Sequence, residues 1–232
     1  MSAIAFGIPV QFDRAYVEGI TQLAAADIQY TEQLGYRIKL LGMSKRREGE
    51  GVELRVHPTL IPARRLIANV EGAMNAVLVQ GDAVGATLHY GKGAGSEPTA
   101  SAVIADLVDV TRLATSDPQH RVPHLAFQPG ALRHVQVLPI EQVITSYYLR
   151  LRVKDETGVL AQVTRILADA GISINAVLQR GTGSAAQNAH ETDLIIFTHN
   201  ALEGSMNAAL ARLQQLPAVL VPIVRIRKEE LA

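Results

Sequence analysis

The sequence predicts an α+β protein in two parts: a mainly antiparallel sheet with helices on one face, followed by a domain with the order βαββαβ. Segments that alternate apolar and polar residues, typical of strands, are interleaved with segments whose apolar residues recur every three or four positions, typical of helices. Between the two parts, residues 112–145 contain Pro118, Pro123, Pro129 and Pro139, a density that disfavours helices and central strands. The length of 232 residues leaves room for two small domains.

The first domain is expected over residues 1–111. A helix is predicted over 13–35, because apolar residues recur at helical spacing and Gly35 follows the last of them. Strands are predicted at 36–41, 52–56, 77–79 and 86–90, with turns at 44–51 and at Gly81-Asp82, and a short helix or a loop over 62–67. We expect these strands to form an antiparallel sheet with helices on one face.

The second domain is expected over residues 146–227, after an extended linker over 112–145. Strands are predicted at 147–153, 172–178, 192–198 and 218–226, and helices at 158–170 and 201–216. The polar, glycine-bearing segment 181–190 is predicted to be a loop. This order of elements is the split ferredoxin-like arrangement.

The composition excludes several classes of function. Lys plus Arg and Asp plus Glu each number 22, so the chain has no electrostatic footprint for nucleic acid or for an anionic membrane. The absence of cysteine excludes disulfides and thiolate zinc sites, and it agrees with a cytoplasmic location. No apolar stretch is long enough to span a membrane, and the histidines lack the spacings of a metal site.

The start of the chain is unusual for a complete protein. An apolar, helix-like segment begins at Met1 without a capping residue or a polar lead-in. We therefore expect that the chain begins partway through a larger protein.

Charged residues inside the predicted strands are mainly expected to lie on strand faces that are exposed to solvent. Lys39 could be a catalytic or phosphate-binding lysine, but Arg37 lies two positions before it, on the same face of an amphipathic strand. This period-two pattern favours the structural interpretation. Glu53 and Arg55 also share one face of their strand, and both are expected to be exposed to solvent.

A glycine-rich turn between a predicted strand and a predicted helix is the most informative local motif. Gly91, Gly93 and Gly95 precede Ser96, which is expected to cap the helix, and Pro98 is tolerated in the first turn. The motif is neither a dinucleotide fingerprint nor a P-loop, because Ser96 replaces the third glycine and the GK[ST] ending is missing. Spacing alone leaves two uses open, a phosphate site at a helix N-terminus and a tight structural turn.

Several segments of the first domain match one family pattern. They are Ala5–Gly7, Glu18–Ile20, Asp27-Ile28, Leu34–Leu41, Val70–Ala76, Gly81-Asp82, Gly91–Gly95, Pro98–Ala100 and Asp106. Together they make residues 1–110 resemble the C-terminal part of the catalytic domain of homoserine dehydrogenase.

This resemblance implies a nicotinamide cofactor, NADP or NAD, in contact with Gly93, Ala94 and Gly95. Most of the cofactor would be bound by an N-terminal Rossmann domain, which this chain lacks. The family's catalytic lysine and substrate-binding carboxylates also lie upstream, so no catalytic residue is assigned here. The implied reaction is the NAD(P)-dependent interconversion of aspartate semialdehyde and homoserine, in the biosynthesis of threonine and methionine. The truncated chain alone is expected to be inactive.

The segment Lys154–Ala161 and the βαββαβ order resemble an ACT domain, a regulatory module that binds an amino acid between paired copies. The matching effector positions are Asp155, Thr157, Gly158, Val159, Leu160, Ser173 and Asn175. Free amides at this strand-to-helix turn suit a carboxylate, and the resemblance implies threonine as the effector and allosteric feedback as the role. Asp155 could instead be a helix cap, and Asn175 a surface polar residue.

Two further expectations concern assembly and the competing class of function. A free sheet edge favours a homo-oligomer, a dimer or higher. The alternative to an enzyme fragment is a non-catalytic amino-acid-binding regulatory module. An in-frame Rossmann domain encoded upstream of Met1 would decide for the enzyme.

Overall fold

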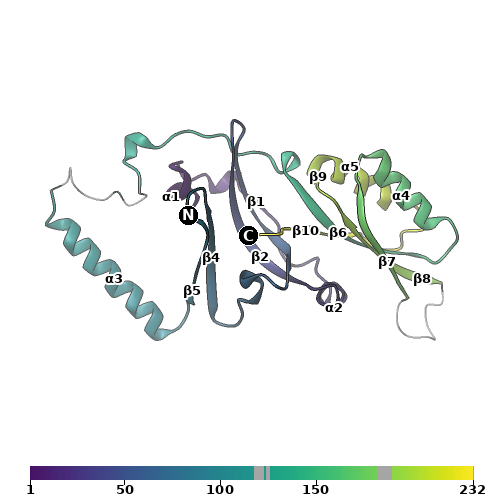
Figure 1. Ribbon diagram of the computed structural model, residues 1–232, viewed down its shortest axis with the longest axis horizontal. Helices are drawn as coiled ribbons and strands as arrows, with labels where there is room; N and C mark the ends of the chain where they lie inside the picture. The colour runs from purple at the N-terminus through teal and green to yellow at the C-terminus, as the bar shows by residue number, and fades with distance from the viewer. Residues whose placement is uncertain (118–122, 124–125, 182–189, 232) are drawn as a thin grey trace. The chain divides into compact units, whose positions relative to one another are not determined.

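The computed structural model describes residues 1–117, 123, 126–181 and 190–231 (Figure 1). The α+β fold class is confirmed. The chain forms two compact units, of which the larger consists of Gln11–Pro62 and Val135–Glu230 and the smaller of the remaining described residues. The larger unit thus combines strands from both halves of the sequence. The predicted loop over 181–190 lies mostly outside the described residues.

One mixed sheet forms the centre of the larger unit. Its strands are β1 (Tyr16–Val17), β2 (Tyr36–Arg47), β3 (Gly51–Pro62), β6 (Ile144–Lys154), β7 (Ile174–Gly181), β8 (Glu191–Thr198), β9 (Ala201–Leu202) and β10 (Val224–Lys228). The strand order is β1-β3-β10-β6-β8-β7, with β2 paired to β3 and β9 to β6. Both β1 and β10 pair in parallel with β3, and the other pairs are antiparallel. The last strand of the chain therefore joins the β2–β3 hairpin to the C-terminal strands.

The β2–β3 hairpin extends well beyond the predicted strands. Its arms stay in register from the pair Tyr36–Pro62 to the pair Arg47–Gly51. Gly51 has φ 142°, and a Cβ there would lie 2.4 Å from the carbonyl oxygen of Gln136. Glycine is required at this point because the 136–138 segment approaches the backbone, where the Val52 N–H donates to Gln136 O at 2.9 Å.

The helix predicted over 13–35 is wrong in its first half. Helix α2 spans only Ala25–Gln33, and Tyr16–Val17 forms β1. The Glu18 N–H continues this pairing by donating to Val56 O at 2.8 Å. The free edge of β3 offers backbone partners to this segment, and tertiary pairing overrides its helical spacing.

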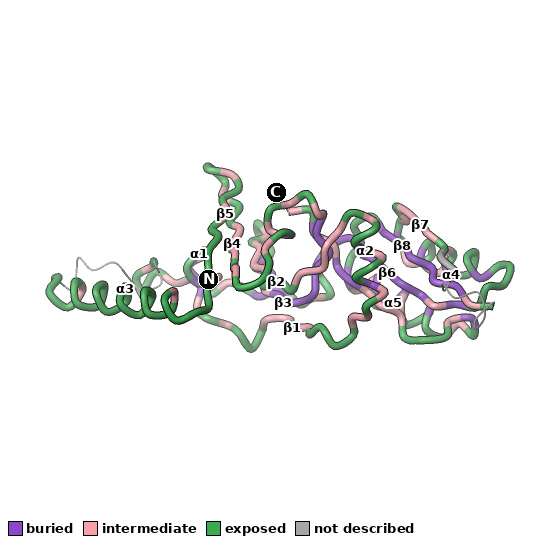
Figure 2. The backbone as a smooth tube through the Cα atoms, turned by 90° about the horizontal axis from the view of Figure 1, so that it is seen from below, coloured by how far each residue is buried: buried purple, intermediate pink, exposed green. Residues whose placement is uncertain are grey.

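The predicted βαββαβ order is confirmed, with α4 (Val159–Asp169) after β6 and α5 (Glu203–Gln214) after β8. Both helices lie on one face of the sheet (Figure 1). They pack over a core that includes Tyr147, Leu149, Leu151, Val163, Leu167, Leu194, Ile196, Met206 and Leu213. Figure 2 shows that burial is concentrated along β3, β6 and β8.

A second core lies on the opposite face of the same strands. It contains Leu60, Tyr148, Ile195, Phe197 and Ile226, with Tyr30 and Leu34 packed against them. Because side chains alternate along β6, Tyr148 points away from the core that holds its neighbour Tyr147. Helix α2 thus covers the face of the sheet that α4 and α5 leave open.

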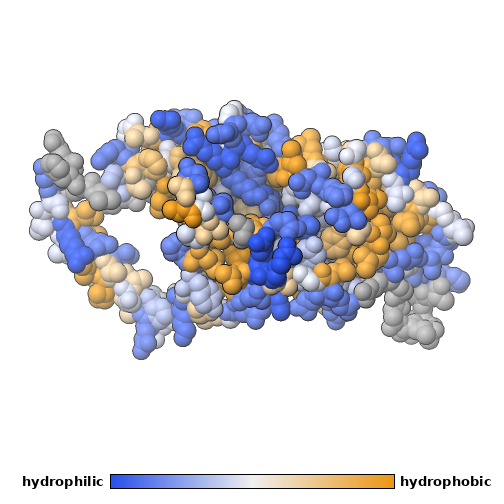
Figure 3. Space-filling model, viewed as in Figure 1, coloured by the Kyte–Doolittle hydropathy of each residue, from blue (hydrophilic) through white to orange (hydrophobic). Residues whose placement is uncertain are grey.

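The smaller unit contains α1 (Ser2–Phe6), the hairpin of β4 (Met74–Gly81) and β5 (Gly85–Lys92), and α3 (Ser96–Ala114). The predicted turn at Gly81-Asp82 connects the two strands. No residue of α3 is buried, and its apolar residues Val103, Ile104, Leu107, Val108 and Val110 are exposed (Figure 3). In the described part of the chain, no helix is both long enough and apolar enough to cross a membrane.

Candidate functional site

The glycine turn predicted to contact a cofactor connects β5 to α3. Gly93, Ala94 and Gly95 are all exposed. Gly95 has φ 130°, and a Cβ at Gly93 would lie 2.4 Å from Nδ2 of Asn75 on β4. The backbone conformation therefore favours glycine at 95, whereas a side chain at 93 would displace the exposed Asn75 amide. Ser96 is itself the first residue of α3 and makes no side-chain capping bond, so the predicted cap is wrong.

The exposed turn leaves open space beside Gly95. Apart from its neighbours in sequence, Pro98 is the only described residue with atoms within 4 Å of the position that a Cβ on Gly95 would take. The free amides of the first turn of α3 follow directly, and a helix N-terminus carries partial positive charge. This turn could orient a phosphate or a nicotinamide ring, but it supplies no acid or base.

The candidate effector turn, Asp155–Gly158, connects β6 to α4. Gly158 precedes the first residue of α4 and has φ 91°, a left-handed conformation that favours glycine. The Asp155 N–H donates to His190 O at 2.7 Å. Its Oδ1 accepts from Nε2 of Gln179 at 3.0 Å. The α4 N-terminus has no side-chain cap, so Asp155 is oriented by β7 rather than by the helix.

The other predicted residues of this turn divide between core and surface. Val159 is buried in the core beneath α4. Thr157 and Leu160 are exposed. Val159 therefore anchors the start of the helix, and the exposed pair is available for contact.

Ser173 and Asn175 are both exposed at the start of β7. The β7–β8 register shifts between Ile174 and Ala176, which makes Asn175 the extra residue of a β-bulge. A bulge redirects a side chain and is common beside binding sites.

The structure separates the predicted effector residues into two groups. Strands β6 and β7 both run antiparallel to β8, so they run parallel to each other and end on the same side, where Gln179 meets Asp155. Asn175 precedes Gln179 by four residues, about 13 Å along a strand. A single chain therefore does not bring Asn175 to Asp155.

Two features near these residues were missed by sequence reasoning. One is Gln179, which lies on the exposed side of β7, two and four positions after Val177 and Asn175. The other is an open groove of about 470 Å³ between α4 and the start of β7, lined by Ala161, Thr164, Arg165, Ala168, Ile172, Ser173 and Ile174. Among the predicted effector residues, this groove includes only Ser173.

The expectation that Glu53 and Arg55 are solvated is wrong. Their exposed fractions are 1% and 2%. The Arg55 Nη2 atom lies 3.1 Å from Glu53 Oε2 and 2.6 Å from Glu229 Oε1, just beyond β10. The C-terminal residues that follow β10 cover this part of β3 and supply the carboxylate that offsets the buried guanidinium.

His57 is fully buried on the same face of β3. Its Nε2 lies 3.2 Å from Arg55 Nη1, and its Nδ1 lies 2.9 Å from the Pro58 carbonyl oxygen. Burial lowers the pKa of His57 to about 4, and the charges of Arg227 and Arg55 act in the same direction. The imidazole is therefore neutral at physiological pH.

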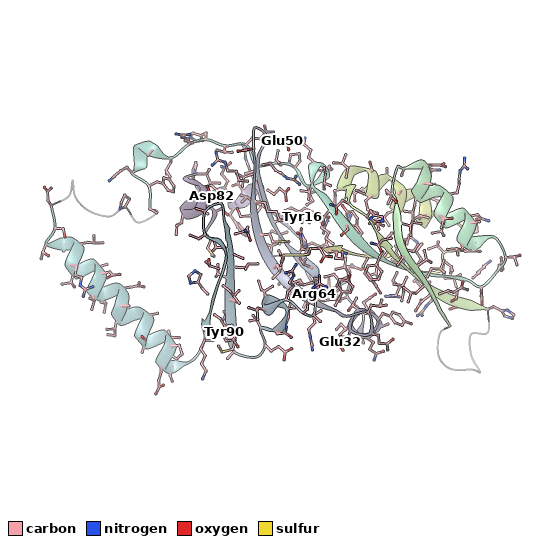
Figure 4. The ribbon with its side chains drawn as sticks, viewed as in Figure 1. Tyr16, Glu32, Glu50, Arg64, Asp82 and Tyr90 are labelled. Atoms are coloured by element: carbon pink, nitrogen blue, oxygen red, sulfur yellow. The ribbon has the colours of Figure 1, made fainter. Side chains whose placement is uncertain are left out.

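A second ionic cluster centres on Arg227, between β1 and the start of α5. Its guanidinium forms a bidentate pair with Glu203 and donates to Glu18 Oε2 at 2.9 Å. Its Cζ lies 4.8 Å from the ring centroid of Tyr16, which is labelled in Figure 4. Burial alone would raise the pKa of Glu203, but the hydrogen bonds and charge of Arg227 outweigh it and hold that pKa below its usual value.

Within the described residues, no group of three or more His, Asp or Glu side chains is arranged to hold a metal ion. The exposed glycine turn and the Asp155–Gly158 turn are therefore the two candidate sites.

The comparison with family models covers both segments that hold these turns. Residues 1–108 match the model for homoserine dehydrogenase, and residues 147–218 match the model for the ACT domain. Residues 1–108 belong to the homoserine dehydrogenase family, and an ACT domain follows them. The glycine turn lies in the homoserine dehydrogenase segment, and Asp155–Gly158 lies in the ACT segment.

The similarity to known proteins extends over the whole chain. It is 57% identical over 231 residues to a homoserine dehydrogenase of Pseudomonas aeruginosa and 50% identical to one of Neisseria gonorrhoeae. The crystal structure of a homoserine dehydrogenase from Thiobacillus denitrificans matches all of this chain, with 63% identity and a TM-score of 0.90. The chain covers 52% of each of the first two proteins and 51% of the third. It therefore spans about half the length of these homoserine dehydrogenases.

Proposed function

We propose that this chain is the C-terminal part of a homoserine dehydrogenase, an oxidoreductase that interconverts aspartate semialdehyde and homoserine with NADP or NAD. The observation that carries the proposal is the pairing of a homoserine dehydrogenase segment with an ACT domain in one chain. The proposal places the protein in the cytoplasm and in threonine and methionine biosynthesis. It follows that the upstream half supplies the Rossmann domain and the acid–base residues.

In this proposal Gly93, Ala94 and Gly95 contact the nicotinamide nucleotide. The absence of side chains at the two glycines and the exposure of the whole turn support this role. The cofactor supplies the hydride chemistry, and this chain contributes binding and orientation. Exposed apolar residues on α3 support a further contact, with the upstream half of the protein.

The ACT domain is proposed to bind a small amino acid, with threonine as the first candidate. The free amides of the Asp155–Gly158 turn would take the carboxylate, and Asp155 would take the ammonium group or the hydroxyl. Thr157, Val159 and Leu160 shape the turn. Gln179 supports the assignment by donating to one carboxylate oxygen of Asp155 and so orienting the side chain.

The complete effector site is proposed to form between two copies of the chain. Strand β7 ends the sheet, with β8 as its one strand partner among the described residues. Antiparallel pairing of two β7 strands about a twofold axis would reverse one of them, so the start of each would lie beside the end of the other. Ser173 and Asn175 of one copy would then approach Asp155 of the second. The separation of these residues within one chain supports this arrangement.

The alternative is a non-catalytic amino-acid-binding module. The observation that favours it is the match of residues 147–218 to the ACT domain. Titration calorimetry with threonine and with NADP, in separate experiments, tests both proposals. Heat with threonine supports the effector site, and the upstream reading frame then separates the enzyme from the module.

A further inference from the structure

Helix α2 is held on the outer face of the sheet by a buried carboxylate. Asp27, fully buried near the start of α2, accepts four hydrogen bonds. Arg150 on β6 donates from Nε to Oδ1 at 2.6 Å and from Nη2 to Oδ2 at 2.9 Å. The Tyr148 hydroxyl donates to Oδ1 at 3.1 Å, and the Ala24 N–H donates to Oδ2 at 3.1 Å. Both oxygens of Asp27 are therefore fully engaged, which fixes α2 against β6.

A second contact, one helical turn further on, repeats this arrangement. The Tyr30 hydroxyl donates to Asp193 Oδ2 on β8 at 3.1 Å. Asp193 is also fully buried and forms a bidentate pair with Arg152 on β6, at 3.0 and 3.2 Å. Two successive arginines on the outer face of β6 thus reach α2, one directly and the other through Asp193.

The same strand leads directly to the candidate effector turn. Arg152 is three residues before Asp155, and β6 ends at the intervening Lys154. The inner face of β6 is fixed as well, because the Tyr147 hydroxyl donates to Glu203 Oε2 at 2.8 Å. A strand held on both faces and paired on both edges transmits a displacement of its end rather than absorbing it.

We propose that the Asp27–Arg150 contact couples the effector turn to the segment that precedes the ACT domain, with α2 as the element that responds. The proposal rests on the proposed function insofar as threonine is the effector. Its physical basis is that a shift of β6 must either carry α2 with it or break a buried bidentate pair. Coupling is reciprocal, so a substitution that loosens α2 must also change ligand affinity at the turn. Helix α2 leads into β2 through Leu34 and Tyr36, which pack on the same core.

The test is hydrogen–deuterium exchange of the full chain, with and without threonine, together with calorimetry. Asp27→Asn keeps the shape of the side chain but removes its charge, and Tyr30→Phe is a milder variant that removes only the hydroxyl. Glu32→Gln on the same helix is the matched control, because Glu32 is exposed and pairs with Arg37 (Figure 4). We expect saturating threonine to slow exchange in α2 several-fold. We expect Asp27→Asn or Tyr30→Phe to weaken threonine binding three- to tenfold, and Glu32→Gln to leave it unchanged.

A second comparison needs no ligand. Asp27→Asn or Tyr30→Phe should speed exchange of the Asp155 amide, which is bonded to His190 O, relative to wild type and to Glu32→Gln. If threonine binds but exchange in α2 does not change, the coupling is overturned and the effector site stands. If threonine gives no heat, the effector assignment fails, and the ligand-free comparison alone decides the coupling. The coupling would be overturned if exchange became faster in α2 but not at the Asp155 amide in both variants.

Discussion

Arg227 and Glu203 form a buried bidentate pair, with Nε to Oε2 at 2.9 Å and Nη2 to Oε1 at 2.5 Å, and each side chain is 1% exposed. Arg227 lies on β10 and Glu203 begins α5. The pair therefore fixes α5 to the strand that joins the two sets of strands in the sheet. Glu18 and Tyr16, beside β3, complete the cluster.

Removing one partner of this pair should be strongly destabilising. Arg227→Met leaves Glu203 buried without its bidentate partner, and we expect a loss of about 3–5 kcal/mol in the free energy of unfolding. Arg212→Met is the control, because Arg212 forms an exposed pair with Asp169. Urea denaturation measures both variants. A loss for Arg227→Met no larger than that for Arg212→Met would contradict the structural role of the cluster.

The stability of the protein should depend on pH through His57. The folded-state pKa is about 4, below the ordinary value of 6.5, so the unfolded chain binds the proton more readily between these pH values. Stability from this group is complete above pH 6.5 and is lost as the pH falls toward 4, a change of about 3 kcal/mol. We expect His57→Asn to flatten this slope in urea denaturation between pH 4.5 and 7. If the free energy of unfolding of the variant changes with pH as steeply as that of the wild type, other groups cause the pH dependence.

The chain should form dimers or larger oligomers through the β7 edge. Val177 on β7 is 37% exposed, and Val177→Lys should weaken association by placing a charge on the pairing strand. Val221→Lys is matched in exposure, also 37%, but lies outside β7. Light scattering at micromolar concentration measures the mass of each. A wild-type mass equal to one chain, or equal effects of the two substitutions, would count against the proposed interface.

The isolated chain should not catalyse homoserine formation. The glycine turn contributes orientation, and no catalytic residue is assigned to the chain. The assay is oxidation of NADPH or NADH with aspartate semialdehyde, with a full-length homoserine dehydrogenase as the positive control. Turnover above that of a blank preparation would show that the catalytic groups lie within these 232 residues.

The elements that local patterns predicted well are those whose own sequence carries the pattern of their secondary structure. Alternation along β6, the apolar run of the buried strand β8 and the apolar stripe of α4 were enough to predict the βαββαβ order. Tyr16–Val17 was misassigned to a helix because a strand of two residues is too short to show an alternating pattern, and its pairing with β3 is set by tertiary contact.

The buried charges were not predictable from local spacing. Glu53 and Arg55 alternate as a solvated face would, and their burial depends on Glu229, which is 174 residues from Arg55. The effector residues of the ACT domain were named from resemblance. Their separation along β7, and the support that Gln179 gives to Asp155, became evident only from the strand directions.

The most direct test of the effector proposal is titration calorimetry of this chain with threonine. We expect binding with a Kd on the order of micromolar to millimolar. Gly158→Val should abolish it, because φ 91° is strained for a β-branched residue at the turn, and Asp155→Ala should weaken it by about 1–3 kcal/mol. Gly171→Val, which imposes similar strain at the other end of α4, should retain binding. No heat at roughly tenfold excess over the weakest expected Kd, or binding unchanged in both turn variants, would contradict the proposed site.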